Sequence, residues 1–277
     1  MKKTILITGA SSGIGHATAR LFASNDWNVI ATMRNPENEK VLTSLNGVLV
    51  TRLDVREPDS IRQAVAAGIA RFGKVDALVN NAGFSLSGVF EANSREKVRE
   101  QFEVNVLGMM DVTREILPHF RKNKSGLIIN ISSRAGLVAP PMLSLYCASK
   151  YALEGFSESL AYELAAQNVV VKIIEPSGGV TGTKFVERLG KERAQQISLR
   201  DYDDFAARAD AVYASIQSAR RTSADEVAQV IYEAATDGTA RLRYFTGEDV
   251  GGFLHARREM AEADYLGFMR SRFGLAQ

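Results

Sequence analysis

Short apolar runs recur along the chain, and longer stretches with helical spacing separate them. Uninterrupted apolar strands that alternate with helices are typical of a parallel sheet covered on both faces. The pattern therefore predicts an α/β fold, a doubly wound parallel sheet with helices on both faces. The expected helices include Ser60–Phe72, Arg95–Leu117 and Ser149–Ala166. The expected strands are Thr4–Thr8, Val29–Thr32, Val48–Leu53, Ala77–Val79, Leu127–Ile131, Val169–Ile174 and Leu242–Phe245.

A glycine-rich turn follows the first predicted strand directly. Residues 9–15 read Gly-Ala-Ser-Ser-Gly-Ile-Gly, and Ala17, Leu21 and Phe22 continue with helical spacing. A dinucleotide-binding loop needs this context, because glycines let backbone N–H groups approach a pyrophosphate and the next helix presents its positive end. An ordinary turn between strand and helix would need one glycine rather than three. The turn therefore favours nucleotide binding.

A tyrosine and a lysine four residues apart form the most informative pair in the chain. Tyr146 and Lys150 would share one face of a helix, and Ser133 precedes them by 13 and 17 residues. A phenol serves acid–base catalysis at neutral pH when a nearby cation stabilises its phenolate. Lys150 is placed to be that cation, and Ser133 could hold a substrate oxygen. The alternative is a half-buried tyrosine beside a solvated lysine, since this spacing also occurs by chance.

The end of the second predicted strand bears on the choice of cofactor. An acidic residue about 20 positions beyond the glycine turn usually binds the ribose hydroxyls of NAD. Met33 and Arg34 stand there instead. Arg34 could bond to a 2′-phosphate and lie flat on the adenine. We therefore expect NADP(H) rather than NAD(H), with a solvated surface arginine as the alternative reading.

Together these residues resemble the short-chain dehydrogenase/reductase family, in its ordinary single-domain form with a Rossmann-like sheet. The resemblance covers about residues 3–185. It implies that Ser133 and Tyr146 hold a substrate oxygen and that Tyr146 is the general acid or base. Lys150 would also bond the nicotinamide ribose, and Asn105 would hold a water that links Lys150 to solvent. The motifs that carry the resemblance are residues 8–15 (Thr-Gly-Ala-Ser-Ser-Gly-Ile-Gly), Asn80-Asn81-Ala82-Gly83, Asn105, Ser132-Ser133, and Tyr146 with Lys150.

The resemblance also implies a set of cofactor contacts. Asp54-Val55 looks like the adenine-contacting pair, although the start of a helix would explain Asp54 as simply. After the sixth strand the family commonly has Pro-Gly, an aliphatic residue and a threonine. Here the segment is one residue longer, so either Thr181 or Thr183 could touch the nicotinamide. The expected cofactor residues are Gly9, Ser11, Ser12, Gly13, Ile14, Gly15, Arg34, Asp54, Val55, Asn81, Ala82, Gly83, Tyr146, Lys150, Pro176, Val180, Thr181 and Thr183.

Composition narrows the class of protein further. The 277 residues are 45% apolar, the net charge of +2 gives no sign of nucleic-acid or membrane partners, and the single cysteine excludes an intrachain disulfide. We expect a cytoplasmic protein, because no apolar run has the length of a membrane span. No metal site is expected, because the three histidines are scattered. Cys147 could be a redox switch, but packing is the simpler reading.

We expect one domain over residues 1–277 that acts on a small carbonyl or alcohol substrate. Within it, residues 184–222 would form a lid over the substrate, although their apolar stripe would serve equally as a packing face. Residues 251–277 would be a C-terminal extension that packs on the body or on a partner subunit. The resemblance implies a homodimer or homotetramer, formed through the helices that begin near residues 95 and 149. Two alternatives stay open: an NAD-linked alcohol dehydrogenase, and a catalytically silent dinucleotide-binding regulator.

Overall fold

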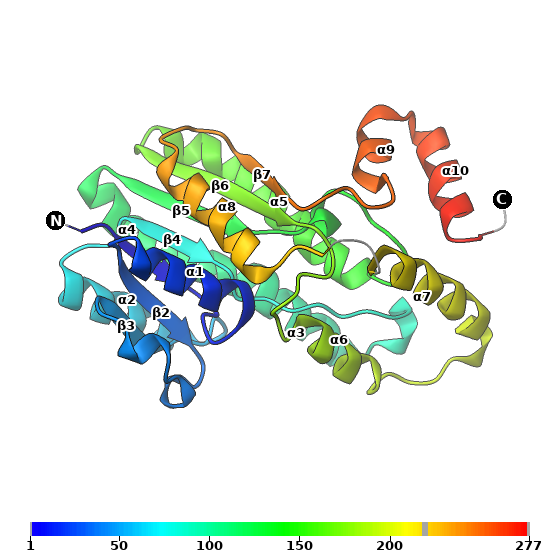
Figure 1. Cartoon of the computed structure of the whole chain (residues 1–277), viewed down its shortest axis with the longest axis horizontal. Helices are drawn as coiled ribbons and strands as arrows, with labels where there is room; N and C mark the ends of the chain where they lie inside the picture. The colour runs from blue at the N-terminus through cyan, green and yellow to red at the C-terminus, as the bar shows by residue number, and fades with distance from the viewer. Residues whose placement is uncertain (1, 218–220, 276–277) are drawn as a thin grey trace.

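Seven parallel strands form one sheet in this computed structural model, which describes residues 2–217 and 221–275 (Figure 1). The strand order is β3-β2-β1-β4-β5-β6-β7, so the chain starts in the middle of the sheet and builds outward in both directions. The predicted α/β fold class is confirmed. The strands are β1 (Thr4–Ile7), β2 (Asn28–Met33), β3 (Val48–Arg52), β4 (Ala77–Asn80), β5 (Gly126–Ile131), β6 (Val169–Pro176) and β7 (Arg243–Thr246).

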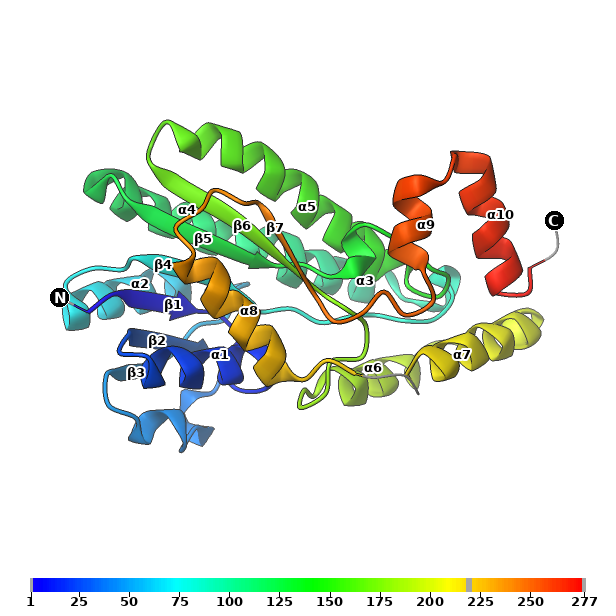
Figure 2. The ribbon, with the colours of Figure 1, turned by 45° about the horizontal axis from the view of Figure 1, so that its top comes forward.

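Helices cover both faces of this sheet (Figure 2). One face packs on α1 (Gly13–Ser24) and α8 (Ala224–Thr236), and the other on α2 (Pro58–Phe72), α4 (Gly108–Asn123) and α5 (Ser144–Ala165). Alternation along β1 shows how the strand serves both layers. Ile5 and Ile7 join the α1 side, whereas Leu6 joins the α2 side, and all three side chains are fully buried. Burial on both faces explains why the strands lack polar alternation in the sequence.

Two predicted helices differ from the observed ones. The stretch expected as one helix over 95–117 is instead α3 (Arg95–Phe102), a π-helical turn at Glu103–Leu107, and α4, which continues through Pro118. Helix α5 begins at Ser144, five residues before the predicted start, so Tyr146 lies in its first turn. A local change from α to π spacing shifts the register of the helix faces, and hydrophobic periodicity alone does not reveal it.

The segment after β6 and the C-terminal segment lie together at one end of the sheet (Figure 1). They contain α6 (Phe185–Arg193), α7 (Asp203–Gln217), α9 (Phe253–Glu259) and α10 (Glu262–Arg272). The apolar stripe of α7 packs against α9 and α10, with Ala209, Tyr265 and Phe273 buried in the shared cluster. Residues 218–220 of the predicted lid and the last two residues of the predicted extension lie outside the described residues.

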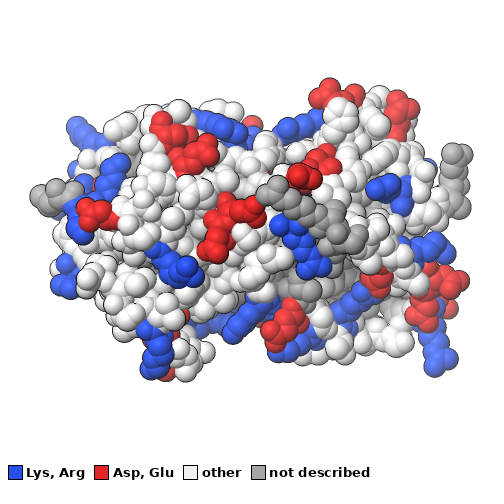
Figure 3. All heavy atoms as spheres, in the orientation of Figure 1, with Lys and Arg blue, Asp and Glu red and all other residues white. Residues whose placement is uncertain are grey.

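Charged side chains are mixed on the surface. Figure 3 shows Lys and Arg interspersed with Asp and Glu on one face, without a broad area of one sign. None of the described helices is long and apolar enough to cross a membrane.

Candidate functional site

The glycine turn joins β1 to α1 at the carboxyl edge of the sheet. Gly9 and Gly13 adopt positive φ angles of 68° and 57°, a backbone region that side chains with a Cβ rarely occupy. A Cβ on Gly9 would also lie 3.0 Å from the Cα of Ala82, so the turn and the residues after β4 approach backbone to backbone. Ser12 precedes α1 and makes no capping hydrogen bond, so its hydroxyl is not used by the helix.

Asn81 fixes the neighbouring loop against this turn. Its side-chain nitrogen donates to the carbonyl oxygens of Thr8 and Gly9 at 2.8 and 3.1 Å, and its backbone N–H donates to the Thr8 hydroxyl at 3.0 Å. These bonds join the ends of β1 and β4, which are neighbours in the sheet. The loops after β1 and β4 therefore form one continuous surface, which we call the floor of the site.

A cavity of about 1090 Å³ lies over this floor. Most of the predicted site residues line it, from the glycine turn through the end of β2 to the loop after β6. Three do not: Asn105 is buried beside Gly83, Gly15 packs against Gly9 and Asn81, and the backbone of Thr181 is bonded to residues 222 and 224. The predicted residues on the wall are Gly9, Ser11, Ser12, Gly13, Ile14, Arg34, Asp54, Val55, Asn81, Ala82, Gly83, Ser133, Tyr146, Lys150, Pro176, Val180 and Thr183.

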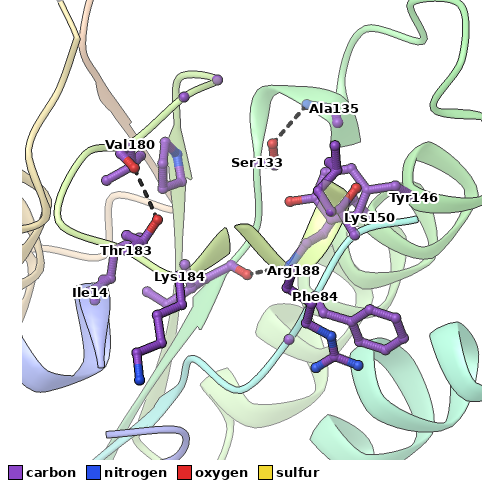
Figure 4. A pocket seen from close by; sticks show the side chains of 18 of the residues that line it. Ile14, Phe84, Ser133, Ala135, Tyr146, Lys150, Val180, Thr183, Lys184 and Arg188 are labelled. Atoms are coloured by element: carbon purple, nitrogen blue, oxygen red, sulfur yellow. Dashed lines mark hydrogen bonds between the residues drawn. The ribbon is translucent and has the colours of Figure 1, made fainter. Parts of the chain in front are cut away.

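Ser133, Tyr146 and Lys150 stand together on one side of the cavity, opposite Ile14, Val180 and Thr183 (Figure 4). Ser133 follows β5 in extended backbone, and its hydroxyl accepts a hydrogen bond from the Ala135 N–H at 3.1 Å. The Ser133 hydroxyl lies close enough to the Tyr146 phenol to lower its pKa. Lys150 follows one helical turn later, with its Nζ 5.8 Å from the centre of the Tyr146 ring and 2.8 Å from the Ile131 carbonyl oxygen.

Burial sets the protonation of this pair. It raises the pKa of Tyr146 to about 12, against a smaller lowering by the Ser133 hydrogen bond. It lowers the pKa of Lys150 to about 8, although the charge of Glu154 opposes this change. The prediction that the lysine would bring the phenol pKa down is wrong for this structure, because burial of the phenol raises its pKa and Lys150 is not among the groups that shift it. The phenol keeps its proton at neutral pH.

Asn105 lies in the π-helical turn between α3 and α4, fully buried beside Gly83. Its side chain exchanges two hydrogen bonds with the backbone of Phe84, at 3.0 and 2.8 Å, and donates to Ser149 Oγ at 3.1 Å. Single π turns inside α-helices are frequent at functional sites. Here the turn holds the loop after β4 to the helix that carries Lys150.

The far end of the cavity carries Arg34 and Asp54. Arg34 is exposed at the end of β2. Burial raises the pKa of the Asp54 carboxyl, but the hydrogen bonds and charge of Arg56, with a smaller contribution from the charge of Arg34, bring it below its usual value. Arg56, which the sequence reading missed, binds both oxygens of Asp54 at 3.3 and 3.1 Å. The sequence does place Arg56 two residues after Asp54, and this spacing could have suggested that the two side chains pair. Helix α2 begins only at Pro58, so Asp54 does not cap it.

Thr181 and Thr183 have different surroundings. The backbone N–H of Thr181 donates to the Thr222 carbonyl at 2.9 Å, and its carbonyl accepts from the Ala224 N–H at 3.0 Å. Thr183 lies on the cavity wall against Gly13, and its hydroxyl donates to the Val180 carbonyl at 3.0 Å. Thr181 thus ties the loop to the start of α8, and Thr183 faces the glycine turn.

Arg134 links the Ser133 loop to the chain after β7. Its guanidinium donates to the carbonyl oxygens of Gly247, at 2.7 Å, and Glu248, and approaches Asp249 at 3.5 Å. The residues that follow, Val250 to Leu254, include part of the cavity wall. Sequence reasoning gave no sign of this contact, because its partners are more than a hundred residues apart.

The single cysteine and the possible metal ligands take no part in the arrangement of Ser133, Tyr146 and Lys150. Cys147 is buried, and burial raises the pKa of its thiol to about 12, which leaves it as an unreactive packing residue. Within residues 2–217 and 221–275, no three His, Cys, Asp or Glu side chains are grouped as metal ligands.

Comparison with known proteins agrees with this geometry. The profile of the family described as short chain dehydrogenase matches residues 3–194. The chain belongs to the short-chain dehydrogenase family. The resemblance stated from the motifs is thus confirmed, and with it an oxidoreductase class.

Members of the short-chain dehydrogenase family similar to this chain include an uncharacterized oxidoreductase of Schizosaccharomyces pombe. It is 38% identical over 245 residues, which cover 88% of this chain and 100% of the relative. Among solved structures, ElxO with NADP bound has a TM-score of 0.73 at 29% identity and covers 92% of this chain and 100% of its own. A Burkholderia phymatum enzyme in complex with NAD has a TM-score of 0.79 at 26% identity, covering 96% and 95%. Both dinucleotides therefore occur among similar structures.

Proposed function

We propose that this short-chain dehydrogenase is an NADP(H)-dependent oxidoreductase that transfers a hydride between the nicotinamide and a ketone or secondary alcohol. The observation that carries the proposal is the placement of the Ser133 and Tyr146 hydroxyls and of Lys150 on one wall of the cavity. The opposite wall holds the glycine turn. A substrate oxygen bound by both hydroxyls would place its carbon between the two walls.

The residues present fit a dinucleotide. The positive φ angles of Gly9 and Gly13 and the uncapped N-terminus of α1 make a cradle for a pyrophosphate. Asp54 suits the adenine amino group, and Lys150 suits the nicotinamide ribose. For the nicotinamide amide we favour Val180 and Thr183 over Thr181, whose backbone is bonded to the start of α8.

In the mechanism we propose, the protein transfers a proton from the Tyr146 hydroxyl to the substrate oxygen. When bound, NADPH supplies the hydride for a ketone or, as NADP⁺, accepts it from an alcohol. Ser133 and Tyr146 donate hydrogen bonds to the substrate oxygen, where negative charge develops during reduction. Tyr146 then gives up its proton as general acid, and Lys150 stabilises the phenolate that remains. Because Tyr146 carries its proton at neutral pH, the resting site is prepared for reduction.

Arg34 carries the proposed preference for NADP(H). Replacing it with leucine (Arg34→Leu) is expected to weaken NADPH binding roughly ten- to a hundredfold, since a charge-assisted hydrogen bond contributes about 1.5–3 kcal/mol. NADH binding should change little, because NADH has no 2′-phosphate. Titration of both cofactors against the protein, followed by nucleotide fluorescence, measures the two affinities.

Arg71→Leu is the matched control for that experiment, because Arg71 is also exposed but does not line the cavity. It should leave both affinities unchanged. An equal loss of NADPH and NADH affinity in Arg34→Leu would contradict the assignment and favour the NAD-linked alternative.

A panel of ketones tests the whole proposal. We expect NADPH fluorescence to disappear with at least one moderately hydrophobic ketone, because Val138, Met142 and Leu254 make one side of the cavity apolar. Binding of NADPH without consumption, for every ketone and alcohol tried, would instead support a silent dinucleotide-binding regulator.

We propose further that residues 184–222 act as a lid and that the C-terminal helices form the outer substrate wall. In support, Arg188 of α6 stacks over the Phe84 ring at 3.8 Å, and Phe253 and Leu254 of α9 line the cavity. A homodimer or homotetramer would use the helical stretch that begins at Arg95 and runs from α3 into α4, together with α5; Leu107, Tyr151 and Tyr162 are exposed along these elements.

A further inference from the structure

A second ionisable cluster lies directly behind Lys150. Glu154 is one helical turn beyond Lys150 on α5, Glu175 stands near the end of β6, and Arg243 opens β7. The Arg243 Nε lies 3.1 Å from a Glu154 oxygen and 3.4 Å from a Glu175 oxygen. Glu154 is 5% exposed and Glu175 is fully buried. Two buried carboxyl groups therefore share one guanidinium nitrogen.

Three carboxyl groups share the guanidinium of Arg243. The Nη2 of Arg243 donates a hydrogen bond to a third carboxylate, that of the half-exposed Glu158, at 2.6 Å. Both Glu175 oxygens and the second Glu154 oxygen have no hydrogen-bond partner among the described residues. Isolated carboxylates are costly to bury, and two that share a site do not both ionise readily. One of the two must keep its proton near neutral pH.

The surroundings decide which one. Burial raises the pKa of Glu154 above its usual value, but the Ser132 hydroxyl beside it, its close contact with Arg243 and the Lys150 ammonium one turn away all oppose that rise. Glu175 is farther from Arg243, and its other cations, Arg258 on α9 and Arg134 after β5, act less strongly. Burial and the charge of Glu154 raise the pKa of Glu175 to about 8.

We propose that Glu175 is held protonated and that the ionised Glu154 is the buried counter-ion that keeps Lys150 charged during turnover. Glu154 lines no part of the cavity, so this is a positioning role that acts through Lys150. The inference rests on the proposed function, because it gives a reason why a buried lysine on the cavity wall stays charged. In this arrangement Arg243 holds the Glu154 carboxylate in place through the 3.1 Å contact, and neutral Glu175 keeps a second negative charge away from the pair.

The pH dependence of ketone reduction tests this role. The charged form of Lys150 is lost as pH rises through its pKa of about 8, so the rate should fall there. Glu154→Gln removes the counter-ion, lowers the lysine pKa and should move this fall to lower pH by about one unit, a roughly tenfold loss on the alkaline side. Glu175→Gln, which imitates the neutral acid, should keep the fall near its wild-type position.

Glu158→Gln is the matched control, since Glu158 lies on the same helix and binds the same arginine but is half-exposed and farther from Lys150. It should not shift the profile. A Glu154→Gln enzyme with a uniform loss at every pH, or a Glu175→Gln enzyme with the same downward shift, would overturn the proposal. Thermal unfolding of each variant separates these results from misfolding.

Direct titration of the wild-type protein needs no activity. With ¹³C-labelled glutamate, the signal absent from the Glu175→Gln spectrum should titrate near pH 8. A Glu175 signal that is already ionised at pH 6 would overturn the proposal even if Tyr146 and Lys150 proved essential. Conversely, a raised Glu175 titration in a protein without ketone reductase activity would leave the charge assignment standing while the proposed function failed.

Discussion

Tyr146→Phe is expected to reduce turnover by about 10²–10⁴-fold, the usual contribution of a general acid or base. The variant keeps the ring that packs beside Ala135 and Cys147 but loses the proton that the substrate oxygen requires. NADPH affinity should stay near the wild-type value, because the change removes one hydroxyl and leaves the glycine turn intact. Steady-state kinetics and cofactor titration on the same preparation measure both quantities.

Tyr162→Phe provides the control for the loss of a hydroxyl. Tyr162 lies on the same helix, but its side chain is 74% exposed, and its replacement should leave turnover unchanged. Full activity in Tyr146→Phe would show that another group delivers the proton, and the proposed mechanism would then be wrong.

Lys150→Met should also impair the enzyme, by roughly 10²–10³-fold, the effect of removing one electrostatic donor from a reacting site. Two features should distinguish it from Tyr146→Phe. NADPH should bind more weakly, because the ribose loses a partner. The fall in rate above about pH 8 should vanish, because its titrating group is gone. A pH series of kcat and a binding titration provide the evidence.

Lys122→Met, an exposed change on α4, is the comparison for Lys150→Met and should reproduce the wild-type pH profile. Persistence of the alkaline fall in Lys150→Met would assign that titration to a different group. It would also remove the basis for a counter-ion at Glu154.

The sequence predicted the sheet and most of the cavity wall for local physical reasons. Strands buried on both faces appear as uninterrupted apolar runs, and β1 and β5 were found within about two residues for this reason. The glycine turn was visible because its backbone angles restrict the residue type at Gly9 and Gly13. The spacing of Tyr146 and Lys150 holds on any helix, so their proximity survived an error of five residues in the start of α5.

Features that depend on distant partners could not be predicted in this way. The π-helical turn around Asn105 is enforced by hydrogen bonds to Phe84 and Ser149, which lie 21 and 44 residues away. The Glu154–Arg243 contact joins residues 89 positions apart. The raised pKa of Tyr146 depends on how deeply the folded chain buries the phenol, which a sequence pattern does not measure. The sequence therefore indicated which groups meet but not their protonation.

The Arg134 contact determines which residues after β7 can be substituted without loss of the contact. Its principal acceptors are main-chain carbonyl oxygens of Gly247 and Glu248, which every amino acid provides. The Glu248 side chain can thus change without detaching this segment, whereas Gly247 is restricted by its φ of 71° and by Thr222 and Ser177, which leave no room for a Cβ. Descendants of this protein could change side chains around Glu248, beside the cavity, while the anchorage to the Ser133 loop is inherited intact.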